Sequence, residues 1–217
     1  MRESQSIDLF EDVALFLEER TKEFGQIPEA RRNELTQLAG YVRGCLTTSG
    51  TAKITFICTH NSRRSHLSQI WAKVAADAYG LTGVQTFSGG TEATAMNPRV
   101  VDSLRRSGFT VQADDPQAVN PVYHVRYSDE AEPLRCFSKV FDQSPNPTTG
   151  YCAVMTCSSA DNACPIVPGC DFRAPIRYED PKVADGTPEE SAIYDERSKQ
   201  ICREMLFVFS EVASHTE

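Results

Sequence analysis

The chain has 217 residues, of which 40% are hydrophobic, so it can build the core of one domain of ordinary size, with or without an appendage. A formal net charge of −8 argues against nucleic acid or an anionic membrane as the main partner, and no apolar run is long enough to cross a bilayer. Residues 1–6 lead into an amphipathic pattern that differs from a secretory leader. The eight cysteines are therefore expected in the reducing cytoplasm, where thiols serve catalysis, metal binding or packing more often than structural disulfides.

Residues 1–50 predict a helical extension in front of the rest of the chain. Apolar residues recur at helical spacing over residues 7–24 and again over residues 28–46, with Gly25 and Pro28 at the junction. We expect this helical hairpin to be a packing appendage or the contact surface of a homodimer, without a catalytic role.

Residues 51–217 predict an α/β domain, because short apolar runs typical of buried strands alternate with amphipathic helical stretches. The expected strands cover 53–58, 84–88, 152–156 and 175–179, and the expected helices cover 65–79, about 97–107 with Asn97 as N-cap, and a final stretch opened by a capping box of Thr187 and Glu190. This order favours a four-stranded parallel sheet with helices on both faces and right-handed crossovers.

Residues 115–150 interrupt that alternation. Residues 122–127 and 136–141 each alternate between apolar and polar side chains, and residues 129–133 lie between them. We expect an inserted β-hairpin. The residues do not decide whether it is a decorated loop or a flap beside the functional site.

The stretch from Lys53 to Ser65 carries the strongest chemical pattern. An apolar strand ends at Cys58, and Arg64 and Ser65 follow at the start of a helix. Loop amides and a helix N-terminus attract anions, an arginine can bind two oxygens of a tetrahedral anion, and the same field favours a thiolate. The pattern therefore predicts Cys58 as a nucleophile with Ser65 as a donor to its sulfur. The expected oxyanion-binding residues are Thr59, His60, Asn61, Ser62, Arg63, Arg64 and Ser65.

The run Cys-Thr-His-Asn-Ser-Arg-Arg-Ser over residues 58–65 resembles the anion loop of the low-molecular-weight tyrosine phosphatases, and more closely that of the thioredoxin-coupled arsenate reductases on the same fold. His60 stands where that family has glycine, which a loop tolerates only if it needs no positive φ there. Arg63 is a second departure. The resemblance extends over residues 52–111 and 151–212.

The resemblance assigns roles to residues downstream of the loop. Cys157 and Cys164 resemble the resolving pair of the arsenate reductases; from the residues alone they could equally be buried thiols or metal ligands. The Asp180-Pro181 dipeptide resembles the general acid that protonates a departing oxygen. The resemblance thus implies a reductase of arsenate with Cys58, Arg64 and Asp180 as catalytic groups, no tightly bound cofactor, and an external dithiol such as thioredoxin as reductant.

Two other functions remain open from the sequence. A phosphatase would use the same Cys58 and Asp180 through a cysteinyl phosphate, although Lys182 and Val183 replace the tyrosines typical of the tyrosine phosphatases. A zinc-binding module would use the four cysteines at positions 152, 157, 164 and 170, at looser spacing than ordinary zinc pairs. Gln69 stands where some relatives have a glutamate for a cation, so no metal site is predicted there.

Overall fold

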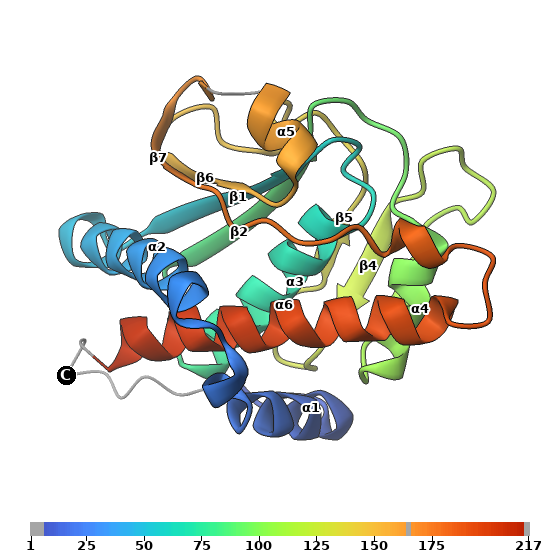
Figure 1. Ribbon diagram of the computed structural model, residues 1–217, viewed down its shortest axis with the longest axis horizontal. Coiled ribbons are helices and arrows are strands. Elements are labelled where there is room, and N and C mark those ends of the chain that lie inside the picture. Colours follow the sequence, from blue (N-terminus) through green and yellow to red (C-terminus); the bar gives the residue numbers. More distant parts are fainter. Residues whose placement is uncertain (1–6, 164–165, 215–217) are drawn as a thin grey trace.

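Four parallel strands form the central sheet in the computed structural model, which describes residues 7–163 and 166–214 (Figure 1). The strands are β1 (Ala52–Cys58), β2 (Val84–Gly90), β6 (Tyr151–Met155) and β7 (Cys170–Ala174), in the order β2-β1-β6-β7. The predicted four-stranded parallel sheet is confirmed. Because β1 is flanked on both sides, its carboxyl end, with Cys58, lies at the middle of the sheet edge where sites of α/β proteins collect.

Helices cover both faces of this sheet, as predicted. The helices are α1 (Glu11–Thr21), α2 (Glu29–Ser49), α3 (Arg64–Ala78), α4 (Pro98–Arg106), α5 (Ser158–Ala163) and α6 (Glu190–Ala213). The large core lies between the sheet and the group formed by α2, α3 and α6, whereas α5 covers the other face over a smaller core (Figure 1). No helix within the described ranges is long and apolar enough to span a membrane.

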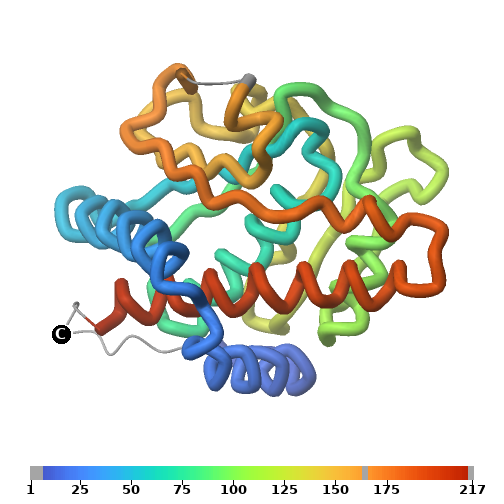
Figure 2. Tube along the Cα trace, viewed as in Figure 1, coloured from blue at the N-terminus to red at the C-terminus, as the bar shows by residue number. Residues whose placement is uncertain are grey.

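Both N-terminal helices pack chiefly against α6, and Figure 2 shows α1 lying along that helix. Val13, Leu17, Leu35 and Leu38 belong to the same core as the sheet, and the ring of Phe16 stacks on Trp71 at 5.0 Å between centroids. The two predicted helices are thus present, and they share one core with the rest of the chain.

A second sheet of three antiparallel strands follows α4. Its strands are β3 (Thr110–Ala113), β4 (Tyr123–Arg126) and β5 (Leu134–Cys136). The predicted hairpin is present as β4 and β5, but β5 lies earlier in the chain than the predicted strand 136–141, and β3 has no counterpart in the prediction. The physical reason is that residues after β5 return to the parallel sheet, where Val140 forms a parallel bridge with Gly90.

Two boundaries near the C-terminus also differ from the prediction. The fourth strand covers Cys170–Ala174, not 175–179; Ile176 and Tyr178 are apolar because they are buried in the large core. The last helix begins at Glu190, whose carboxylate accepts a hydrogen bond from Gly186 N at 2.6 Å, so Thr187 does not form the predicted capping box. The Asn97 cap is confirmed, since its side chain accepts from Arg99 N at 3.0 Å.

Candidate active site

Cys58 ends β1, and the chain turns through residues 59–63 before α3 begins at Arg64. The cysteine is 3% exposed, and its Sγ lies 3.1 Å from Ser65 Oγ in the first turn of α3. The strand–loop–helix arrangement therefore brings the predicted nucleophile and the predicted hydroxyl donor together. The amides of the loop and of the α3 N-terminus provide positive potential for an anion.

A chain of hydrogen bonds fixes the direction of the Ser65 hydroxyl. Lys139 N donates to Asn61 Oδ1 at 3.0 Å, and Asn61 Nδ2 donates to Ser65 Oγ at 2.9 Å. Since Ser65 Oγ accepts from Asn61, its own proton is free to point at Cys58 Sγ. A donor aimed at the sulfur stabilises the thiolate over the thiol.

The backbone of the loop has one residue at positive φ, Asn61 at 44°, so His60 does not need the freedom of glycine. Residues after β2 bind the loop from behind. Thr91 N donates to Cys58 O at 3.1 Å, and Glu92 N donates to Thr59 O at 2.9 Å. The loop shape is thus set by main-chain contacts.

Arg64 and Asp180 meet across the site. Arg64 Nη2 lies 2.6 Å from Asp180 Oδ2, and Arg64 Nη1 donates to Tyr178 O at 3.1 Å. Asp180 also caps the 3₁₀ turn Pro181–Ala184, because its side chain accepts from Lys182 N at 3.1 Å. The two residues predicted to bind the anion and to protonate the leaving oxygen therefore lie side by side.

Cys157 brings a second thiol to the same edge of the sheet. It follows β6, its Sγ lies 3.5 Å from Thr59 Oγ1, and it accepts a hydrogen bond from Ala160 N at 3.3 Å. Cys157 and Cys58 share the smaller core with Ile57. Cys164, its predicted redox partner, lies outside the described residues.

The side chain of Arg63 leaves the loop. Its Nε donates to the Tyr194 hydroxyl at 2.8 Å, and its Nη2 lies 3.3 Å from Asp185 Oδ2. These partners lie on other elements, so the contacts of its guanidinium do not support the predicted binding of an oxyanion by this side chain.

The sequence did not indicate that the inserted segment contacts the loop. Besides the Lys139 contact with Asn61, Ser138 Oγ donates to His60 O at 2.9 Å. Both contacts join residues 78 positions apart and use a main-chain atom, so no local sequence pattern predicts them.

Two basic side chains near the loop are buried. Burial lowers the pKa of Lys139 to about 8 and the pKa of His66 to about 3.

Residues 53–126 match the family model described as low molecular weight phosphotyrosine protein phosphatase. Over these residues the chain is therefore similar to the low-molecular-weight protein tyrosine phosphatases. The matched residues include the whole loop of residues 59–65 and end before Cys157 and Asp180.

Curated relatives are named as arsenate reductases. One from Bacillus licheniformis is 25% identical over 160 residues, covering 73% of this chain and 94% of the relative. Another, arsenate reductase 2 of Staphylococcus haemolyticus, is 27% identical over 129 residues, covering 59% and 77%. Among solved structures, a phosphotyrosine phosphatase from Vibrio cholerae superposes with a TM-score of 0.48 at 11% identity, covering 73% of this chain and 95% of that one.

No three His, Cys, Asp or Glu side chains within residues 7–163 and 166–214 are arranged to hold a metal ion. Burial raises the pKa of Cys152 well above its usual range, which favours a neutral thiol in the core. The zinc alternative therefore gains no support from Cys152, Cys157 and Cys170.

Proposed function

We propose that the protein reduces arsenate to arsenite with Cys58 as nucleophile. The observation that carries this proposal is the place of Cys157, whose sulfur contacts Thr59, the residue directly after Cys58. A second thiol beside the oxyanion loop can resolve a covalent adduct by sulfur chemistry, which hydrolysis does not need. The curated arsenate reductases that resemble this chain support the same function.

In the first step, arsenate lies in the loop of residues 59–65 and is bound by its amides and by Arg64. The Cys58 thiolate attacks arsenic, and one oxygen departs as water after Asp180 supplies a proton. This step forms a bond between Cys58 Sγ and arsenic, and arsenic keeps the oxidation state +5.

In the second step, the Cys157 thiolate attacks Cys58 Sγ. A Cys58–Cys157 disulfide forms, the electron pair of the sulfur–arsenic bond passes to arsenic, and arsenite leaves. Cys164 then attacks Cys157 and releases Cys58 as a thiolate. An external dithiol of the thioredoxin kind, in the reducing cytoplasm, donates two electrons to the Cys157–Cys164 disulfide.

Phosphomonoester hydrolysis is the second candidate, and the Arg64–Asp180 pair favours it. The same carboxyl group that protonates a leaving oxygen can activate water against a cysteinyl phosphate. Phosphate and arsenate are nearly isosteric, so we expect some hydrolysis of small aryl phosphates in either case.

The test compares wild type with Cys58→Ser, Cys157→Ser and the control Cys45→Ser, whose thiol lies on α2. Arsenate reduction is followed with a thioredoxin system, and hydrolysis is followed with a small aryl phosphate. We expect Cys58→Ser to abolish both activities, Cys157→Ser to lose reduction and keep hydrolysis, and Cys45→Ser to keep both. Wild-type protein that hydrolyses the ester but does not reduce arsenate would overturn the reductase proposal.

A further inference from the structure

Arg63, Tyr194 and Asp185 form a closed triangle of polar contacts behind the oxyanion loop. Arg63 Nε donates to the Tyr194 hydroxyl at 2.8 Å, and that hydroxyl donates to Asp185 Oδ1 at 2.7 Å. Arg63 Nη2 closes the triangle at 3.3 Å from Asp185 Oδ2. Burial, followed by the hydrogen bond to Asp185, raises the pKa of Tyr194 to about 12, so its hydroxyl stays protonated and can donate.

This triangle holds one end of the turn that carries Asp180. The turn Pro181–Ala184 has Asp180 before it and Asp185 directly after it, and Asp185 N donates to Lys182 O at 3.0 Å. At the other end, Asp180 pairs with Arg64. Two consecutive arginines at the end of the oxyanion loop therefore bind the two ends of one short turn.

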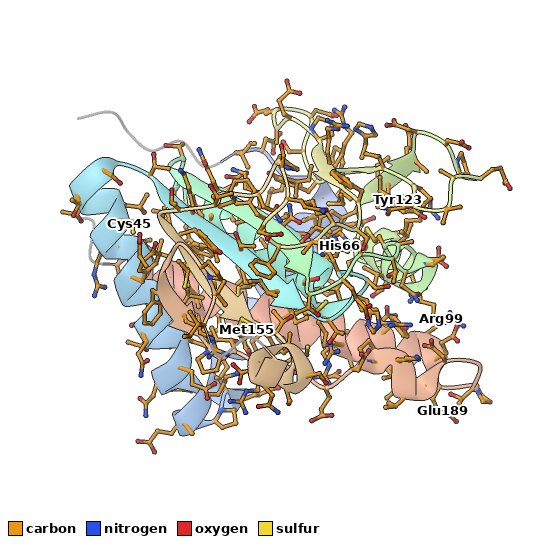
Figure 3. All side chains as sticks on the ribbon, turned by 90° about the horizontal axis from the view of Figure 1, so that it is seen from above. Cys45, His66, Arg99, Tyr123, Met155 and Glu189 are labelled. Atoms are coloured by element: carbon orange, nitrogen blue, oxygen red, sulfur yellow. The ribbon has the colours of Figure 1, made fainter. Side chains whose placement is uncertain are left out.

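Arg99 on α4 supports the same turn from outside. Its Nε lies 2.6 Å from Glu190 Oε2 and 3.7 Å from Asp185 Oδ1. The Glu190 carboxylate in turn accepts from Gly186 N at 2.6 Å. Figure 3 shows Arg99 close to Glu189, at the opposite end of the molecule from Cys45. Charged side chains from the loop, α4 and α6 thus converge on residues 185–190.

We propose that Arg63 is a positioning residue for the general acid. It binds Asp185 and Tyr194, fixes the turn Pro181–Ala184, and so holds the Asp180 carboxyl group at the leaving oxygen. This inference rests on the proposed role of Asp180 as proton donor. It gives a function to the arginine at which the chain departs from the pattern of the family that it resembles.

The consequence is a specific kinetic defect. A displacement of a catalytic group by about 1 Å can cost about a hundredfold in rate. If Arg63 only positions the acid, its loss slows departure of poor leaving groups, which need a proton. Good leaving groups depart without a proton from Asp180, so the rate with such esters should not change.

The experiment measures kcat and KM for phenyl phosphate and for dinitrophenyl phosphate. The variants are Arg63→Met, the conservative Arg63→Lys, Tyr194→Phe and Asp180→Asn. We expect Arg63→Met to lower kcat/KM for phenyl phosphate about ten- to hundredfold and to leave kcat/KM for the dinitrophenyl ester nearly unchanged. The ratio kcat/KM reports only the steps up to formation of the cysteinyl phosphate, before Asp180 activates water. Asp180→Asn shows the same selectivity with a larger loss, and Arg63→Lys restores part of the rate.

Arg106→Met is the matched control. Arg106 joins α4 to Asp195 of α6 through contacts of 2.8 and 2.9 Å, and it has no hydrogen bond or ion pair with residues 180–186. We expect this variant to keep the wild-type ratio between the two esters. An equal loss of kcat/KM on both esters in Arg63→Met would show that Arg63 acts on the anion itself and would overturn the proposal.

A second measurement does not depend on turnover. Amide hydrogen exchange over residues 182–186 should be faster in Arg63→Met than in wild type and Arg106→Met, because the turn loses its anchor. Unchanged exchange would overturn the positioning role, whether or not the protein hydrolyses esters. If the wild type does not reduce arsenate, the proposed function is overturned, but the hydrogen-exchange result still tests the positioning role of Arg63.

Discussion

The two halves of the oxyanion loop are held in different ways. The first half, residues 59–61, is bound mainly by uncharged hydrogen bonds from residues 91–94 and 138–139, most of them to main-chain atoms. Its one contact with a charged group is exposed and joins His60 Nε2 to Glu92 Oε1 at 2.9 Å. The second half, Arg63 and Arg64, is bound by ion pairs to Asp185 and Asp180. Directional uncharged bonds fix the sulfur and its donor, whereas ion pairs hold an acid whose charge changes during the reaction.

The largest effect is expected where the uncharged side is most crowded. A Cβ on Gly90 would lie 2.2 Å from Glu92 O and 2.6 Å from Thr59 O, so Gly90→Ala must push the loop out of place. We expect kcat/KM to fall more than about a hundredfold. Gly44→Ala on α2 is the control, since its Cβ meets open space and we expect full activity there. Normal activity in Gly90→Ala would show that the loop does not need this support.

Asn61→Ala breaks the link between the inserted segment and the nucleophile. Without Asn61 Nδ2, the Ser65 hydroxyl is free to turn away from Cys58, and the alanine must adopt a positive φ. We expect about 2–3 kcal/mol lower stability and slower alkylation of Cys58 by iodoacetamide at neutral pH. Control rates from Cys58→Ser correct for other thiols. An unchanged alkylation rate would show that Asn61 does not affect the reactivity of the Cys58 sulfur.

His66 makes the uncharged side sensitive to acid. Its pKa is lowered from 6.5 to about 3 by burial and then by the nearby Lys139, so below pH 6.5 the unfolded chain binds a proton that the folded chain does not. Stability should therefore fall as the pH falls from 6.5 towards 3, by about 2 kcal/mol at about pH 5. Urea unfolding of wild type and His66→Gln at about pH 8 and 5 measures this difference. Parallel losses in both proteins would exclude His66 as its source.

Ser138→Ala removes two uncharged contacts, because Ser138 Oγ donates to His60 O at 2.9 Å and accepts from Thr94 N at 2.8 Å. Loss of these hydrogen bonds should lower the free energy of unfolding by about 1 kcal/mol, measured by urea denaturation, at both low and high salt. A loss that disappears in high salt would contradict the uncharged character of this side.

The charged side should show the smallest single effect at its outer rim. Glu190→Gln weakens the pair with Arg99 and keeps an acceptor for Gly186 N. We expect a small drop in the urea midpoint that high salt removes, because exposed ion pairs are screened. A large drop in the urea midpoint, or a drop that salt does not change, would show that the Arg99–Glu190 pair is more than a weak surface ion pair.

Local patterns predicted one part of the site well. The apolar run before Cys58, the loop and the start of α3 follow one another in the chain, and so do Asn97 and Pro98, whose cap is confirmed. In each case the interacting groups are close in sequence, so spacing alone carries the information.

The rest depends on partners far away in the chain. Arg63 meets Tyr194 across 131 positions, and Ser138 meets His60 across 78. The strand Cys170–Ala174 contains the charged residues Asp171 and Arg173, so its composition does not mark it as a buried strand. Its pairing with β6 makes it one. Burial in the large core gives Ile176 and Tyr178 the appearance of a strand.

The bridge between Gly90 and Val140 also decides how the sheet ends. β2 is an edge strand, and three of its carbonyls accept hydrogen bonds from outside the sheet. Thr86 O accepts from Gln69 Nε2 at 3.2 Å, Ser88 O from Asn146 Nδ2 at 2.9 Å, and Gly90 O from Phe141 N at 3.0 Å. An open edge invites another chain to add a strand. Here the segment after β5 covers that edge, so it protects the protein against edge-to-edge aggregation while it supports the loop.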